Sequence, residues 1–162
     1  MTNFPLDKET FCDQVIRNQE AMFRTAKSIL RQDEDAEDAV QEAICAAYAS
    51  RGSLRDPARS RPWILKILVN KCYEFCRKRR TTVDLADVQD FLPAPAADQT
   101  ERLSLWQAVM ALNRDLRAVV TLFYYEDLSI REISAVLGIS EAAVKTRLSR
   151  GRSRLKQLLH EE

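Results

Sequence analysis

The sequence has 162 residues, 46% of them hydrophobic, and a formal net charge of +1. Only three glycines and five prolines, with long stretches rich in Ala, Leu, Arg and Glu, favour an all-α protein over a many-turned β protein. No apolar run approaches the roughly 20 residues of a membrane span, and the N-terminus lacks the basic start and apolar core of a signal peptide. We therefore expect a cytoplasmic protein with no membrane insertion of its own.

The small net charge conceals blocks of opposite sign. Residues 1–50 carry ten acidic and five basic residues, whereas residues 51–80 carry ten basic and two acidic ones. Residues 81–100 hold four Asp and no base, and residues 140–162 carry six Lys or Arg against three acids. Such alternation indicates separate faces for separate partners, at least one of them a polyanion.

The acidic segment 81–100 divides the chain. Pro93 and Pro95 forbid a continuous helix there, so the segment is predicted to be a flexible linker. It leaves residues 1–80 as an N-terminal helical domain and residues 101–162 as a C-terminal one, both within the size at which small domains fold alone. Its acidity has two interpretations, an ordinary solvated linker or a segment that shadows a nucleic-acid path.

Two helices are expected in the first 50 residues. The first ends before Arg31, and Asp33 is expected to cap the second, whose first turn is crowded with acids that the positive end of the helix dipole favours. The apolar residues that predict the first helix are Phe11, Val15, Met22, Phe23, Ala26, Ile29 and Leu30. Those of the second are Ala36, Val40, Ala43, Ile44, Ala47 and Tyr48. Gly52 and Pro57 then mark a loop.

A third helix is expected over residues 61–80, with Pro62 in its opening turn. Its core stripe comprises Ile64, Ile67, Leu68, Cys72 and Phe75. The opposite side is expected to present one exposed line formed by Lys66, Asn70, Tyr73 and Arg77. Such a line suits single-stranded nucleic acid, because cations follow phosphates, a ring stacks on an unpaired base and an amide bonds a base edge. A solvated basic helix with an incidental Tyr is an equally open interpretation.

The C-terminal part is predicted to contain a helix-turn-helix. Ser129 caps a helix, Gly138 supplies the turn and Ser140 caps the next helix. The first helix turns Ile130, Ile133, Val136 and Leu137 inward, and the second is expected to turn inward Val144, Leu148, Gly151, Leu155 and Leu159.

The second of these helices has an outward line of Ala142, Ala143, Thr146, Ser149, Arg150 and Ser153. Six bases and no acid lie between Lys145 and Lys156. A low-profile face flanked by cations can enter a major groove while the cations hold phosphates. The alternative is a basic amphipathic helix packed in some other helical assembly.

The sequence predicts no catalytic site, metal site or cofactor, because no nucleophile, acid and base converge and no Gly-rich phosphate loop is present. The four cysteines, Cys12, Cys45, Cys72 and Cys76, lack the paired CxxC spacing of a zinc site and are expected to be small buried or half-buried thiols. Cys72 and Cys76 lie one helical turn apart, which leaves a redox or metal role weakly open. His160, the one histidine, is expected to be a solvated surface residue.

Three segments together resemble the bacterial RNA polymerase sigma factors, in particular the small extracytoplasmic-function (ECF) group. DAEDAVQEAICAAY, residues 35–48, resembles that family's signature for docking on core polymerase. RPWILKILVNKCYEFCRKRR, residues 61–80, resembles the helix that follows. LRAVVTLFYYEDLSIREISAVLGISEAAVKTRLSRGRSRLKQLL, residues 116–159, resembles the C-terminal DNA-binding region.

The resemblance implies a transcription initiation factor that binds core RNA polymerase, directs it to specific promoters and assists promoter melting. Against a coiled coil of the polymerase clamp it places Asp35, Asp38, Gln41 and Glu42. Near the melted downstream promoter element it places Lys66, Asn70, Tyr73, Arg77, Lys78, Arg79 and Arg80. At the duplex upstream element it places Ser140, Lys145, Thr146, Arg147, Ser149, Arg150 and Arg154. An inhibitory anti-sigma factor is a further partner that the family commonly has.

The chain departs from the family's pattern at three places. Ala142 and Ala143 stand where members often have Gly-Thr, and Gly151 stands where they often have Ala. The loop GSLRD carries Leu54 where many members have an aromatic residue that captures an unpaired base, so the base preference of that pocket stays open.

Two other classes of protein fit the sequence less well. A repressor or activator with a ligand-sensing or dimerising N-terminal domain predicts duplex binding without polymerase and a palindromic site, but nothing in the sequence resembles a dedicated dimerisation helix. An enzyme has the least support, because the sequence offers no convergent catalytic or metal-binding groups.

Overall fold

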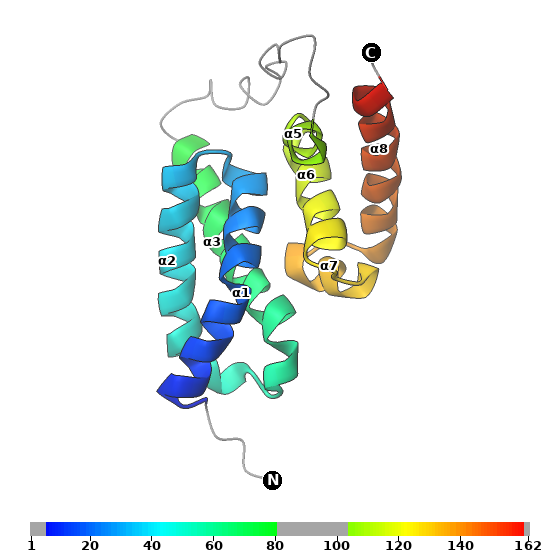
Figure 1. Cartoon of the computed structure of the whole chain (residues 1–162). Coiled ribbons are helices and arrows are strands. Elements are labelled where there is room, and N and C mark those ends of the chain that lie inside the picture. The colour runs from blue at the N-terminus through cyan, green and yellow to red at the C-terminus, as the bar shows by residue number, and fades with distance from the viewer. Residues whose placement is uncertain (1–5, 81–103, 161–162) are drawn as a thin grey trace.

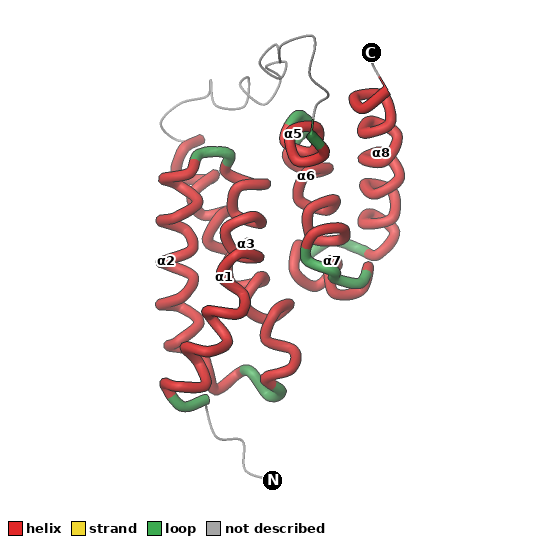
Figure 2. Tube along the Cα trace, viewed as in Figure 1, coloured by secondary structure: helices red, strands yellow, loops and turns green. Residues whose placement is uncertain are grey.

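The computed structural model describes residues 6–80 and 104–160, with the side chain of Arg80 excepted (Figure 1). The predicted linker, residues 81–100, lies outside the described residues. Within the described ranges the chain forms seven α-helices, short 3₁₀ turns and one π-helical turn, and it forms no strand (Figure 2). The all-α prediction is confirmed. No helix of the described part is long and apolar enough to cross a bilayer.

The N-terminal helices α1 (Lys8–Leu30), α2 (Asp33–Ala49) and α3 (Ser60–Arg80) pack against one another as a bundle (Figure 1). All three lie within a few residues of their predicted bounds. The cap of α2 was predicted wrongly: the N-cap is Gln32, which makes no side-chain capping bond, and Asp33 is the first helical residue. Asp33 Oδ1 instead forms an ion pair with Lys27 Nζ at 2.6 Å, and this pair connects the start of α2 to the end of α1.

The core of the bundle is closely packed because α2 buries four alanines, Ala36, Ala39, Ala43 and Ala47. Their small side chains let α1 and α3 approach α2 closely. The neighbours supply the bulk with buried large residues that include Met22, Ile64 and Leu68. The predicted apolar faces of α1 and α3 are therefore confirmed in these residues, and interdigitation of small and large side chains gives the density typical of protein interiors.

A buried polar network fixes the beginning of α3 against α1. The Asn18 Nδ2 donates to Ser60 Oγ at 3.1 Å, and Ser60 Oγ donates to Gln14 Oε1 at 2.6 Å. Arg61 Nε donates to Asn18 Oδ1 at 3.0 Å. Asn18 and Ser60 are buried, so these bonds satisfy groups that would otherwise be costly to desolvate.

The C-terminal helices are α5 (Leu105–Met110), α6 (Arg114–Val120), α7 (Ile130–Leu137) and α8 (Glu141–His160). Between α6 and α7 lies the π-helical turn η3 (Thr121–Tyr125), which is closed by the bond from Glu126 N to Thr121 O at 3.2 Å. A π-helical turn contains one residue more than an α-helical turn. Glu126 follows this turn, and its side chain is fully buried.

The N-terminal and C-terminal helices share one hydrophobic cluster. It joins residues of α1, α2 and α3 to Val119 on α6, Ile133 on α7 and Leu148 on α8. α3 packs against α7, and α1 packs against α6 and η3, so that α6 lies between α1 and α8 (Figure 1). The two groups of helices, which we call the N-terminal and C-terminal modules, are thus in direct contact.

Candidate nucleic-acid interface

The turn between α7 and α8 has the geometry of a helix-turn-helix. Ser129 and Glu132 form a reciprocal capping box at the start of α7, with bonds of 2.9 and 3.1 Å. Gly138 ends α7 with φ at +69°, a left-handed conformation that Gly adopts without strain. Ser140 Oγ accepts from Ala143 N at 3.0 Å and caps α8. The predicted roles of Ser129 and Ser140 as N-caps and of Gly138 in the turn are therefore confirmed.

The inward and outward faces of α8 separate as predicted, except that Ala143 of the outward line is half-buried and Leu159 of the inward line is exposed. Val144, Leu148, Gly151 and Leu155 are buried, but Leu159 is 39% exposed because it lies in the last turn of α8, beyond the packing contacts. The exposed residues of the predicted DNA-contacting set are Ser140, Lys145, Thr146, Ser149, Arg150 and Arg154. These small and cationic side chains form a surface that can approach a duplex without steric obstruction.

Two arginines of α8 are engaged inside the C-terminal module. Arg147 Nη2 lies 4.0 Å from Asp115 Oδ2 on α6, and its side chain is only 28% exposed. Arg152 donates from Nε to the hydroxyl of Tyr124 and lies over the Phe123 ring at 5.7 Å from its centroid. Arg147 therefore differs from Lys145 and Arg150, which are exposed.

On α3 the predicted line is exposed at Lys66, Asn70 and Arg77, and Lys78 and Arg79 follow it on the surface. The prediction that Tyr73 is exposed was wrong. Its ring is half-buried and packs against the shared hydrophobic cluster. Burial raises the pKa of the Tyr73 hydroxyl, the negative charge of Asp115 raises it further, and Arg147 opposes the shift. Charged groups of the C-terminal module thus act electrostatically on this hydroxyl.

A groove of about 800 Å³ opens beside the start of α3. Lys66 and Trp63 line one wall, and Arg131 and Glu132 of α7 line the opposite one. Trp63 Nε1 donates to Ser53 Oγ at 2.9 Å, which fixes the preceding loop. Leu54 also lines the groove but is 93% buried, with an exposed fraction of 7%. Leu54 is therefore packed into the fold and contributes little accessible surface to the groove.

The acidic face of α2 is exposed at Asp38, Gln41 and Glu42. Asp35 differs from them, because its side chain is 17% exposed and forms an ion pair with Arg79 at the end of α3. This contact joins a residue predicted for polymerase docking to one predicted for DNA binding. Asp35 braces α2 against α3, whereas the other three residues are open to a partner.

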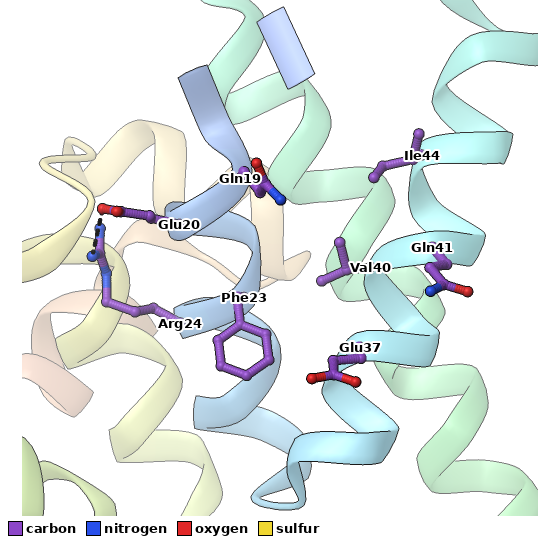
Figure 3. A pocket seen from close by; sticks show the side chains of 8 residues that line it. All are labelled: Gln19, Glu20, Phe23, Arg24, Glu37, Val40, Gln41 and Ile44. Carbon is purple, nitrogen blue, oxygen red and sulfur yellow. Dashed lines mark ion pairs between the residues drawn. The ribbon is translucent and has the colours of Figure 1, made fainter. Parts of the chain in front are cut away.

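Next to this face, α1 and α2 enclose a groove of about 680 Å³ (Figure 3). Phe23 from α1 and Val40 and Ile44 from α2 give it apolar walls, and Glu37 stands at its edge. Arg24 and Glu20, both on α1, also line the groove and form an ion pair at 3.8 Å. The groove is continuous with the acidic face, since Gln41 lines both.

The four cysteines form neither a metal site nor a reactive buried thiolate. Cys72 is buried, and its burial raises the pKa of the thiol far above its ordinary range, so the reactive thiolate does not form there at neutral pH. Cys12 and Cys45 are exposed on α1 and α2, contrary to the expectation of buried or half-buried thiols. Among the described residues, no cluster of three or more His, Cys, Asp or Glu side chains is arranged to hold a metal ion.

Sequence reasoning missed three residues that join the modules: Arg24, Arg117 and Glu126. Arg24 makes two hydrogen bonds to Glu126, and these raise the pKa of its guanidinium. Arg117 is completely buried. A charged residue is ordinarily expected at the surface, and no helical periodicity of the sequence marks Arg117 and Glu126 as buried or Arg24 as a partner of Glu126.

Two family models match the chain. Sigma-70 region 2 matches residues 15–82, and Sigma-70, region 4 matches residues 102–155. The ECF RNA polymerase sigma factor SigM of Mycobacterium tuberculosis is 33% identical over 159 residues, which cover 94% of this chain and 79% of SigM. The RNA polymerase sigma factor SigV of Bacillus subtilis is 33% identical over 129 residues, which cover 79% of this chain and 78% of SigV.

Two solved structures are similar over both modules. The sigma factor RpoE from Bartonella quintana, in complex with the anti-sigma factor NepR, superposes with a TM-score of 0.75 at 25% identity, covering 95% of this chain and 99% of RpoE. CnrH in complex with the cytosolic domain of CnrY superposes with a TM-score of 0.66 at 29% identity, covering 94% of this chain and 89% of CnrH.

Proposed function

The chain belongs to the sigma-70 family of bacterial RNA polymerase sigma factors, in its extracytoplasmic-function group, and from this premise we propose how its surfaces divide the work of initiation. It is a transcription initiation factor, not an enzyme: it binds core RNA polymerase, directs it to promoters and assists their melting. One observation carries this function, the presence of region 2 and region 4 in one chain, each on its own group of helices.

The acidic face of α2 docks on core polymerase. Asp38, Gln41 and Glu42 support this role because they are exposed on one helix beside an apolar groove. Asp35 contributes indirectly, since its pair with Arg79 holds α2 in place.

The two basic surfaces bind promoter DNA. The α3 surface serves the melted downstream element through Lys66, Asn70, Tyr73, Arg77, Lys78, Arg79 and Arg80. The α8 surface serves the upstream duplex through Ser140, Lys145, Thr146, Arg147, Ser149, Arg150 and Arg154. Residues 1–80 and 101–162 form the corresponding domains, joined by the linker 81–100. An exposed cationic helix face supports these assignments except at Tyr73 and Arg147, which are partly covered, and at Arg80, whose side chain lies outside the described part.

The factor works in the cytoplasm, where core polymerase lies, and it takes an anti-sigma protein as inhibitor. The second of these proposals is supported by its similarity to RpoE and CnrH, both of which were solved with such a protein.

Transcription from genomic fragments with purified chain and core polymerase tests the proposed function. Discrete start sites should appear only when both components are present, and the Asp38→Arg variant should reduce their yield. Absence of association between the wild-type chain and core polymerase would reject the function. Duplex binding at a palindromic site without polymerase would instead favour a conventional repressor or activator.

A further inference from the structure

Two aromatic residues of the π-helical turn η3 restrict one arginine of α8. Arg152 donates from Nε to the Tyr124 hydroxyl, and its Cζ lies 5.6 Å from the centroid of the Tyr124 ring. The same Cζ lies 5.7 Å from the centroid of the Phe123 ring, and the two rings meet edge-on with centroids 4.9 Å apart. One hydrogen bond and two cation–π contacts therefore orient a side chain that is still exposed to solvent.

Tyr124 is the aromatic residue of η3 that neither core uses. Phe123 packs against the shared hydrophobic cluster, and Tyr125 packs edge-on against Trp106. Tyr124 lies between them and is 46% exposed. Single π-helical turns occur frequently at functional sites, where the extra residue changes the direction of a side chain. Here the side chain with the free direction contacts Arg152 on α8.

Arg152 belongs to a line of residues along one flank of α8. Lys145, Ser149, Arg152 and Lys156 follow one another at spacings of four, three and four residues, so they share one side of the helix. All four are exposed. Ser149 is also part of the outward face, so this cationic flank borders the surface assigned to the duplex. Among the described residues, none of its three cations makes an ion pair.

The arginines of the opposite flank have protein partners. Arg147 Nη2 lies 4.0 Å from Asp115 Oδ2, and Arg154 Nη1 donates to Gln157 Oε1 at 3.0 Å. The partner of Arg152 is a neutral hydroxyl, so its positive charge is not compensated within the described part of the chain. Its bond to Tyr124 uses Nε alone, which leaves both Nη groups to donate to an acceptor outside the chain.

We propose that Arg152 binds a phosphate group of the upstream duplex and that Tyr124 is its positioning residue. The inference rests on the proposed function, because it places this phosphate beside the α8 face that was assigned there to duplex DNA. A planar guanidinium donates to two phosphate oxygens at once, and both Nη groups are available for this. Because Tyr124 already restricts Arg152, binding costs less side-chain entropy than it would for an unrestrained arginine.

Titration of a fluorescent mixed-sequence duplex with the full chain at several salt concentrations tests the phosphate contact. Each phosphate contact contributes about 0.9 to the slope of log affinity against log salt, so Arg152→Ala should reduce the slope by about this amount. The weakening should be equal for duplexes of different sequence, since phosphates carry no base identity. Arg152→Lys keeps the charge and should retain the slope. Arg17→Ala removes an exposed arginine of α1 and should leave the slope unchanged, which controls for net charge.

Tyr124→Phe separates positioning from charge, because it keeps the ring and removes the hydroxyl. It should weaken duplex binding about threefold at fixed salt, the magnitude of one hydrogen bond. In an Arg152→Ala or Arg152→Lys background the same change should have no effect, since no guanidinium remains to be oriented. A residue that only stabilises the fold would act equally in all three backgrounds. Circular dichroism confirms that each variant, altered at exposed positions, remains folded.

A folded Arg152→Ala chain with the wild-type salt slope overturns the phosphate contact, even if its association with core polymerase falls, because the flank would then face a protein. Equal effects of Tyr124→Phe with and without Arg152 overturn the positioning role. Absence of duplex binding by the wild type at about 50 mM salt overturns both. Failure of the proposed function has a different signature: the wild type would not start transcription with core polymerase, while the duplex titrations would respond to Arg152→Ala as described.

Discussion

At the scale of single residues, Gly151 marks the closest approach of α8 to α6. A Cβ placed on Gly151 would lie 2.7 Å from Cγ2 of Val120, which is itself buried. Val120 is β-branched and has few rotamers to which it can move. The contact with Val120 therefore favours Gly over Ala at position 151.

Gly151→Ala should lower the free energy of unfolding by about 1 kcal/mol. The expected overpacking cost of about 1–3 kcal/mol exceeds the gain of about 1 kcal/mol from replacing a helical Gly by Ala. Urea unfolding followed by circular dichroism measures the change. In a Val120→Ala background the same substitution should become stabilising, because the obstructing methyl group is gone; a stabilising effect in the wild-type background would contradict the close contact.

At the scale of elements, α8 presents a reading face whose parts are separable. Arg150→Ala should weaken binding of the upstream duplex by about 1–3 kcal/mol and relax sequence preference if Arg150 reads a base edge. Fluorescence anisotropy over a series of salt concentrations and duplex sequences measures both effects. Arg154→Ala is the comparison, because Arg154 is exposed and already bonds Gln157 Oε1 at 3.0 Å. Uniform weakening across sequences by Arg150→Ala would mean that Arg150 holds phosphate only.

The acidic face of α2 gives a second prediction for an element. Asp38→Arg reverses an exposed charge, so it should lower the affinity for core polymerase at least about tenfold, equivalent to about 1.4 kcal/mol, and should leave the melting temperature nearly unchanged. Pull-down with core polymerase and thermal unfolding measure these quantities.

Asp13→Arg, on an exposed position of α1, controls for the charge change itself. If both substitutions weaken core binding equally, the effect is one of net charge and the docking assignment to α2 is wrong.

The sequence predicted these elements well where local chemistry decides the structure. The capping box of Ser129, the turn at Gly138 and the buried line from Val144 to Leu155 follow from side-chain types at fixed spacings. Leu159 follows the same spacing but is exposed, because periodicity does not show where the packing partner ends.

Contacts between elements far apart in the chain could not be predicted in this way. Arg117 is a basic residue on a helix, a residue type that ordinarily lies at the surface, yet it donates to Ser28 O and is completely buried. The amino-acid types at Thr121–Tyr125 do not indicate the π-helical turn that precedes the buried Glu126. Tyr73 occupies an outward position on an isolated α3 but is half-buried in the fold, where it packs against the hydrophobic cluster that both modules share.

At the scale of the whole molecule, the shared core makes unfolding a property of both modules together. The chain has two tryptophans, and each module contains one of them. Trp63 lies at the start of α3, and Trp106 on α5 packs edge-on against Tyr125, with ring centroids 5.2 Å apart. Each indole therefore reports on the packing of its own module.

The last prediction uses these two reporters in single-tryptophan variants, Trp106→Phe and Trp63→Phe. In otherwise wild-type chains the two fluorescence transitions should share one urea midpoint with circular dichroism, because the Arg24–Glu126 pair and the common core couple the modules. Adding Arg24→Gln leaves Glu126 buried without its cation, which is costly in the closed form, so the modules should separate and their midpoints diverge. Different midpoints already present in the wild-type background would mean that the modules unfold independently and that their contact contributes little to stability.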